Sequence, residues 1–111
     1  VDDFNTYRQR MNDLILSQDN KVIKRFFSLD NQTYEEGALS EVTKELLGLV
    51  ASMVLRCDDC IKYHLGRCHE LGVTKAQIHE ASSPTLIVGG SIFIPHMRSA
   101  AEYWEQLESH M

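Results

Sequence analysis

Residues 41–55 carry apolar side chains at helical spacing, and these fall almost all round the helix. A helix that is apolar on every side must be covered on every side, so it belongs at the centre of a core. Ser40 is a good N-cap for it, and Glu41 in the first turn suits the positive end of the helix dipole. The apolar residues are Leu46, Leu47, Leu49, Val50, Val54 and Leu55. The rest of the chain must therefore surround a central helix.

Helical spacing of apolar residues continues before the central helix. It predicts one helix over about 3–17 and a second, short one around Val22 to Phe27. Residues 29–39 are polar, and we expect a connection there with one helical turn at most.

After the central helix, the sequence predicts a helix over about 58–71 that Gly72 ends, and a further helix that Thr74 caps. Pro84 should kink or end that helix. Apolar residues from Met97 to Leu107 fit one face of a terminal helix.

The segment 86–94 is ambiguous because two short apolar runs flank Gly89-Gly90. That pattern also fits a β-hairpin, but an isolated hairpin is marginal in water, and we prefer two helices that meet at the glycines. The expected fold is therefore all-α, with about five to seven helices in a single domain over residues 1–111.

Charge and apolar content exclude several classes of protein. Eleven Lys and Arg against 16 Asp and Glu give a net charge of −5, which argues against nucleic acid and anionic membranes as partners. The longest nearly apolar stretch, 84–95, is far shorter than the roughly 20 residues that span a bilayer. We see no signal-peptide pattern at the start, and three cysteines are too few for a secreted disulfide scaffold, so we expect a cytoplasmic protein.

Cys57, Cys60 and His64 stand at i, i+3 and i+7, so they share one face of the helix predicted there. At a helix start the dipole favours a thiolate, and the two cysteines are close enough to form a disulfide. His64 can take the proton of Cys60 one turn away. Glu45 is a carboxylate in the apolar central helix, and a buried carboxylate that orients His64 would explain it.

The run from Glu45 through Cys57 and Cys60 to His64 resembles the active-site motif of the alkylhydroperoxidase D-like (AhpD-like) branch of the carboxymuconolactone decarboxylase family. The resemblance covers about residues 40–107, including Lys44 to Thr74. It implies an all-α protomer that assembles into trimers, or into hexamers as dimers of trimers.

The resemblance also implies an enzyme, a thiol peroxidase or disulfide reductase without a cofactor or metal. By position, Cys60 is then the cysteine that attacks the hydroperoxide, Cys57 resolves it, and His64 and Glu45 form the proton relay. A dithiol protein or a lipoyl-type reductant would reset the pair. Well-studied peroxidases of the family have a second histidine where this chain has Asp59, and a nearby anion opposes thiolate formation.

A zinc-binding structural module is the alternative that the residues leave open. Cys57, Cys60 and His64 could bind zinc with Glu45 as the fourth ligand. Cys68 could not join them, because eleven helical residues span about 16 Å; we expect it to be a buried small residue. His96 faces either the site or a subunit contact, or it is a packed, hydrogen-bonded histidine, and the last is the reading we prefer.

Overall fold

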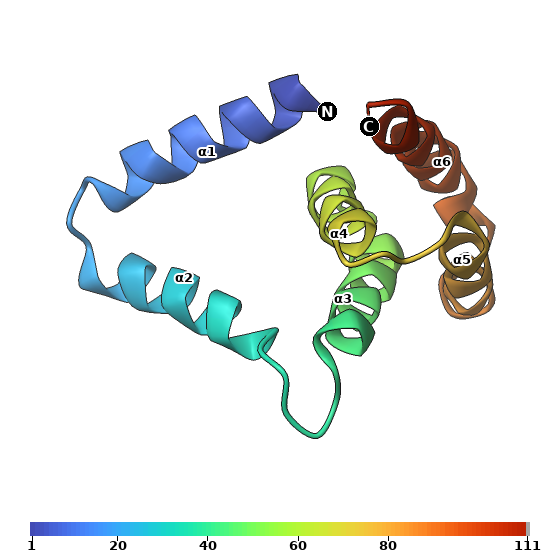
Figure 1. Cartoon of the computed structure of the whole chain (residues 1–111), viewed down its shortest axis with the longest axis horizontal. Coiled ribbons are helices and arrows are strands. Elements are labelled where there is room, and N and C mark those ends of the chain that lie inside the picture. Colours follow the sequence, from blue (N-terminus) through green and yellow to red (C-terminus); the bar gives the residue numbers. More distant parts are fainter. Residues whose placement is uncertain (111) are drawn as a thin grey trace.

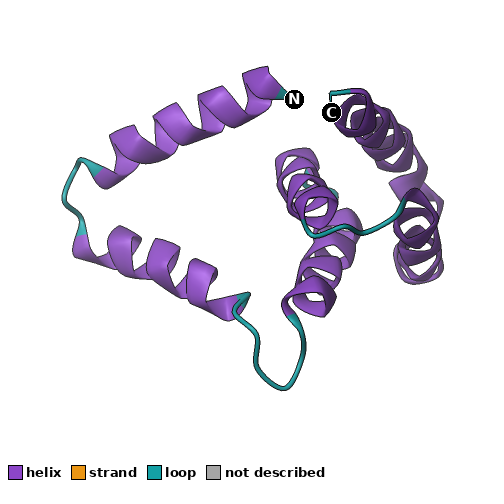
Figure 2. Ribbon diagram, in the orientation of Figure 1, coloured by secondary structure: helices purple, strands orange, loops and turns teal. Residues whose placement is uncertain are grey.

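The computed structural model describes residues 1–110, and within that range the chain is helical with no strand (Figure 2). This confirms the all-α prediction. The described residues form six α-helices and one 3₁₀ helix, η1: α1 (Asp2–Leu16), α2 (Lys21–Thr33), α3 (Glu41–Leu55), α4 (Asp58–Glu70), α5 (Lys75–Gly89), η1 (Ser91–Phe93) and α6 (Ile94–Ser109). Within the same range, no helix is both long enough and apolar enough to cross a bilayer.

The core is built around α3, as its apolar pattern predicts. α3 packs against α4 and α5, and α4 packs against α6. Leu49 and Met53 of α3 are completely buried, and so is Leu65 of α4. The other buried apolar residues are Ile61, Cys68, Val73, Ile78, Phe93, Ala100, Tyr103, Trp104 and Leu107.

We call α1 and α2 the arm, because they extend away from the core and close a ring with α3 and α4 (Figure 1). None of the residues of α1 or α2 is buried. Side-chain contacts attach α1: among them, Phe4 packs edge-on against Tyr103 of α6, and the guanidinium of Arg8 lies 4.1 Å from the centre of the Tyr63 ring of α4. The arm is therefore held by a few side chains rather than by a core of its own.

One helix boundary, and one of the two alternatives for Pro84, differ from the sequence-based expectation. The second helix starts at Lys21, where the Asn20 side chain accepts a hydrogen bond from the Ile23 amide, and it continues to Thr33 through residues expected to form a connection. Its last turns are exposed, and an exposed polar turn has no apolar period to reveal it. The fifth helix does not end at Pro84. Thr85 is fully buried where α5 packs on α3, and this packing offsets the hydrogen bond that proline removes.

The apolar segment around Gly89-Gly90 is helical on both sides, as predicted. α5 ends at Gly89, and Gly90 then takes a φ of +80°, which favours glycine over any residue with a side chain. η1 follows and brings Phe93 into the core with 1% of its surface exposed.

Candidate active site

The candidate site starts at the tight turn between α3 and α4. Arg56 ends α3 in a left-handed conformation, with φ 59°, and Cys57 is already the N-cap of α4. The Cys57 sulfur accepts a hydrogen bond from the Cys60 amide at 3.3 Å. A sulfur in this position takes the place of the usual capping oxygen, and the amide favours an anionic sulfur there.

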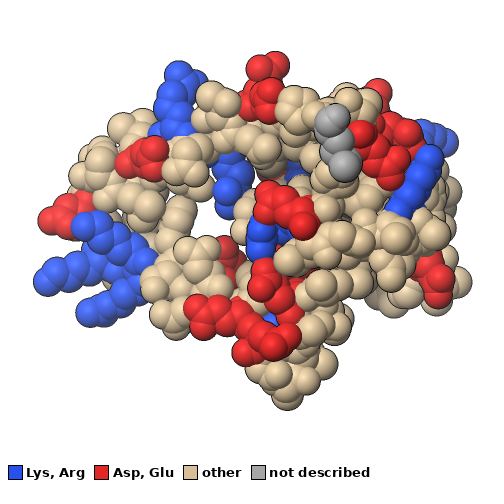
Figure 3. All heavy atoms as spheres, viewed as in Figure 1, with Lys and Arg blue, Asp and Glu red and all other residues tan. Residues whose placement is uncertain are grey.

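Cys57 and Cys60 form a disulfide, with their Cα atoms 5.3 Å apart. Cys60 is exposed and lines a cavity of about 470 Å³ together with His64, whereas Cys57 is not among the lining residues. The core side of this cavity is completed by Asp59 and Tyr63, and the arm side by Phe4, Tyr7, Arg8, Met11, Asn12 and Asp30. Figure 3 shows the molecule hollowed between the arm and the core.

Behind Cys60, Glu45 and His64 form a buried pair. Nδ1 of His64 lies 2.8 Å from Oε2 of Glu45, and the two residues keep 7% and 1% of their surfaces exposed. A carboxylate can only accept, so Nδ1 carries the proton and Nε2 is left as the acceptor of the neutral ring. The sequence placed these two residues on different helices, and the structure brings them together.

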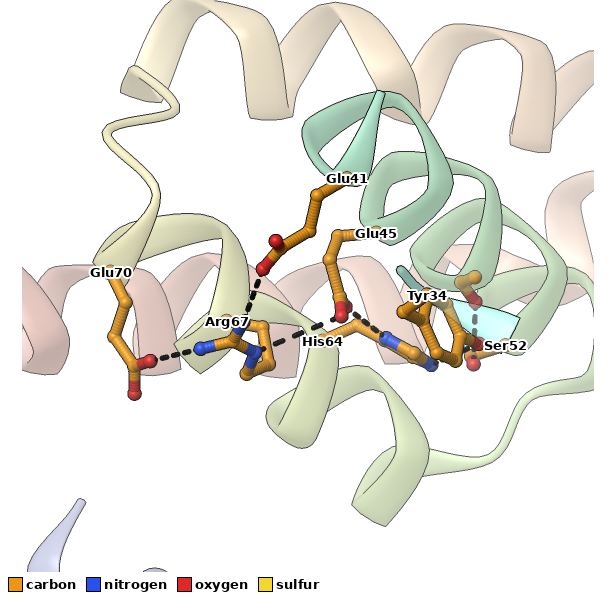
Figure 4. Close-up of polar contacts among 8 residues, drawn as sticks. Tyr34, Glu41, Glu45, Ser52, His64, Arg67 and Glu70 are labelled. Carbon is orange, nitrogen blue, oxygen red and sulfur yellow. Dashed lines mark hydrogen bonds and ion pairs between the residues drawn. The ribbon is translucent and has the colours of Figure 1, made fainter. Parts of the chain in front are cut away.

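Arg67 contacts the other oxygen of Glu45. Its Nε lies 3.7 Å from Oε1 of Glu45, its Nη2 donates to Glu41 at 2.7 Å, and its Nη1 donates to Glu70. Figure 4 shows these side chains in a row that continues through His64. A buried carboxylate needs a compensating charge, and Arg67 supplies it. Arg67 was not predicted as a site residue, although its place one turn after His64 on α4 was a usable signal.

Tyr34, at the end of α2, was also missed. Its hydroxyl lies 3.5 Å from Nε2 of His64, and the two ring centres are 5.4 Å apart (Figure 4). Burial raises the pKa of Tyr34, and the nearby charges of Asp30 and Glu45 act in the same direction, so the hydroxyl keeps its proton.

Each member of the buried pair lines a cavity. His64 lines the cavity of Cys60, while Glu45 lines a second cavity of about 300 Å³. The residues around this second cavity are Asn31, Tyr34, Glu35, Glu41, Glu45, Tyr63 and Arg67. Both members of the pair therefore border space in which a proton donor or acceptor can be placed.

Among known proteins, the chain matches the sequence model of the carboxymuconolactone decarboxylase family over residues 20–106. This stretch contains α3, α4 and all four residues of the motif. The chain belongs to the carboxymuconolactone decarboxylase family. The match agrees with the AhpD-like branch that the motif predicted.

Solved structures of the family share this fold. A Thermotoga maritima protein is 48% identical, with a TM-score of 0.96 over 99% of this chain and 96% of that one. In a second structure, the same Thermotoga protein is named a carboxymuconolactone decarboxylase family protein, and an involvement in an antioxidative response is suggested for it. A family protein from Legionella pneumophila, 22% identical, has a TM-score of 0.82 over 96% of this chain and 98% of that one, which shows the fold alone.

Protein 4 of the cox locus of Paracoccus denitrificans is 34% identical over 56 residues. That alignment covers half of this chain and half of the Paracoccus protein.

The two remaining candidates of the motif region have different surroundings. Asp59 lines the cavity beside Cys60. Nδ1 of His96 lies 2.8 Å from Oδ1 of Asp58, the first residue of α4. His96 thus ties the start of α6 to the start of α4, as a hydrogen-bonded histidine, and it is not among the residues that line either cavity.

The zinc interpretation finds no support in the geometry. Within residues 1–110, no group of three or more His, Cys, Asp or Glu side chains is arranged to hold one metal ion. Both nitrogens of His64 already face partners, Glu45 and Tyr34.

Cys68 is a free, fully buried cysteine on a later turn of α4. Burial raises the pKa of its thiol to about 12, and the negative charge of Glu45 acts in the same direction. At pH 8 almost none of it is thiolate, the form that reacts. We therefore expect the fully reduced native chain to show two thiols that react rapidly with a disulfide reagent, and a third only after unfolding. A Cys68→Ala variant should show two under both conditions, and three rapid thiols in the native wild type would contradict the assignment.

Proposed function

We propose that the chain is a thiol-dependent oxidoreductase that works through the Cys57/Cys60 pair. The observation that carries the proposal is a disulfide at a cavity edge with the buried Glu45–His64 pair behind it. A thiol beside a histidine that a carboxylate orients is the arrangement of an activated nucleophile. The antioxidative involvement suggested for the Thermotoga protein points the same way.

We further propose that the oxidant is a hydroperoxide. In the reduced chain, Nε2 of His64 takes the proton of the Cys60 thiol, and the thiolate attacks the nearer peroxide oxygen. The O–O bond breaks, Cys60 becomes a sulfenic acid, and the leaving alkoxide or hydroxide takes the proton back from His64. Cys60 is assigned this role because it lines the cavity with His64, whereas Cys57 does not.

Cys57 then closes the cycle. Its thiolate attacks the sulfenic sulfur, the disulfide forms, and hydroxide leaves and is protonated to water. A dithiol protein or a lipoyl-type dithiol attacks the disulfide and gives up two electrons, which restores both thiols and leaves the donor oxidised. Asp59 beside Cys60 disfavours the thiolate, so we expect thiol–disulfide exchange to be faster relative to peroxide reduction than it would be with a neutral side chain there.

We also propose that the protomers assemble into trimers or hexamers. Ile87, Val88 and Ile92 are 86%, 75% and 59% exposed, and Leu55 of α3 adds to the apolar surface. Apolar exposure on this scale is typical of protein contacts. Trp104 of α6 is buried within the protomer and does not belong to this surface. Sedimentation equilibrium at micromolar concentration tests the assembly, and a monomer would contradict it.

The catalytic proposal is tested by supplying the fully reduced chain with cumene hydroperoxide or hydrogen peroxide, and with dihydrolipoamide or a dithiol protein as reductant. We expect peroxide-dependent oxidation of a dithiol, with loss of two chain thiols in a single turnover without reductant. A Cys68→Ala variant should keep the activity. If no peroxide oxidises the pair and no dithiol reduces its disulfide, the function is wrong.

A further inference from the structure

Tyr34 comes from the arm side of the molecule, yet its hydroxyl meets the imidazole of His64 on α4. The Tyr34 hydroxyl contacts Nε2 of the ring, while the Glu45 carboxylate contacts Nδ1. Because Nδ1 bears the proton, Nε2 of the neutral ring accepts and the Tyr34 hydroxyl donates. The contact is long at 3.5 Å, as hydrogen bonds at catalytic groups often are before a substrate binds.

Two features of α3 hold Tyr34 at this place. The Lys44 ammonium donates to the carbonyls on either side of it, to Thr33 at 2.9 Å and to Glu35 at 2.7 Å. These bonds fasten the end of α2 onto α3 just before the relay carboxylate, Glu45. Tyr34 is therefore positioned by the helix that also supplies the carboxylate.

Gly48, one turn further along α3, provides the space. A Cβ built there would lie 2.8 Å from the Tyr34 hydroxyl oxygen and 2.7 and 2.9 Å from Cε1 and Nε2 of His64. Real Cβ atoms essentially never approach other atoms so closely. The Tyr34 hydroxyl and the His64 ring can therefore approach each other only because Gly48 has no side chain.

We propose that Tyr34 is a positioning residue of the proton relay, whose hydroxyl fixes the imidazole of His64 with Nε2 as the acceptor. The inference rests on the proposed function, since it assigns a part to Tyr34 in the same relay. Tyr34 would hold the ring in place while Cys57 and Cys60 are joined and no thiol is available to it.

A hydroxyl suits this position because it can either donate or accept a hydrogen bond. It donates to the single lone pair of Nε2 in the neutral ring and gives up this bond when the Cys60 thiol approaches. Once Nε2 has taken the proton of Cys60, the hydroxyl oxygen can accept from the imidazolium. Phenylalanine keeps the ring packing and loses both bonds. Tyr34→Phe therefore isolates the hydroxyl.

The test uses the full chain in its disulfide form with ¹⁵N-labelled histidine, in which His64→Gln identifies the His64 signals. We expect Tyr34→Phe to move the Nε2 resonance to higher frequency, toward that of a ring nitrogen without a hydrogen bond. Tyr63→Phe is the matched control, because the Tyr63 ring packs 5.1 Å from the same imidazole without a hydrogen bond to it. It should leave the resonance in place.

In the reduced chain, Tyr34→Phe should slow the first turnover with peroxide about three- to tenfold, the factor that one neutral hydrogen bond represents. An Nε2 resonance that is unchanged in Tyr34→Phe, or that moves equally in Tyr63→Phe, overturns the inference. If the resonance moves as expected but the wild type has no turnover, the positioning by Tyr34 stands and the proposed function fails.

Discussion

Cys60→Ser should abolish the reaction of the reduced chain with peroxide, whereas Cys57→Ser should consume about one equivalent and then stop. Cys60 lines the cavity together with His64, so its proton has an acceptor; serine is too weak an acid to replace it. Without Cys57, the sulfenic acid formed on Cys60 has no resolving thiol, because Cys68 is buried on a later turn. Single-turnover kinetics with trapping of the sulfenic acid by a dimedone reagent measure both outcomes.

One contact favours the opposite assignment, in which Cys57 attacks the peroxide and Cys60 resolves the sulfenic acid. The Cys60 amide donates to the Cys57 sulfur, and this contact favours a thiolate on Cys57 after reduction. If Cys57→Ser is the variant that loses the first turnover, the capping contact outweighs His64 and the assignment is reversed. If neither variant changes peroxide consumption, the chain does not reduce peroxide at this site.

Gly48→Ala should lower the rate of the first turnover about 100-fold, within the range that a general base contributes. The added methyl group would overlap the His64 ring and the Tyr34 hydroxyl, so the imidazole must shift from the position in which Glu45 holds it. The free energy of unfolding should fall only slightly. Alanine is a better helix former than glycine by roughly 1 kcal/mol, and this gain offsets part of the strain.

Gly66→Ala is the matched control on the neighbouring helix. Nothing lies within 4 Å of a Cβ built at Gly66, so alanine should raise the free energy of unfolding by roughly 0.5–1 kcal/mol and leave the turnover unchanged. Thermal melts and single-turnover rates of both variants separate the two effects. Equal activities for Gly48→Ala and the wild type would show that the relay does not need the space at Gly48.

The sequence predicts the core helices well because each has an apolar period that packing enforces. The central helix begins and ends where the pattern placed it, from Glu41 to Leu55. The end of α2 could not be found in this way, because its last turns are exposed and their polar residues have no period to follow. The sequence left open whether α5 kinks or ends at Pro84, and the helix continues because a tertiary contact, the burial of Thr85, outweighs a local preference.

The residues of the candidate site likewise include some that the sequence predicts and others that it does not. Cys57, Cys60 and His64 share local helical spacing, and Glu45 stood out as a charge in an apolar helix, so these four could be read from the sequence. Tyr34 reaches His64 across 30 residues, and nothing local marks it except an aromatic ring in a polar segment. Gly48 looks like any small residue of a buried helix until the two groups that meet above it are known.

The walls of the cavity at Cys60 differ in what their substitution costs. Tyr7 and Met11 come from an arm without a buried residue, whereas Cys60 and His64 stand on a helix of the core. A mutation in the arm can therefore reshape the space offered to a substrate at little cost in folding stability. Residues of the arm wall can be exchanged, whereas those of the core wall are restricted by packing. Substitutions in the arm can therefore change the preferred substrate one residue at a time, while Cys60 and His64 keep the same chemistry.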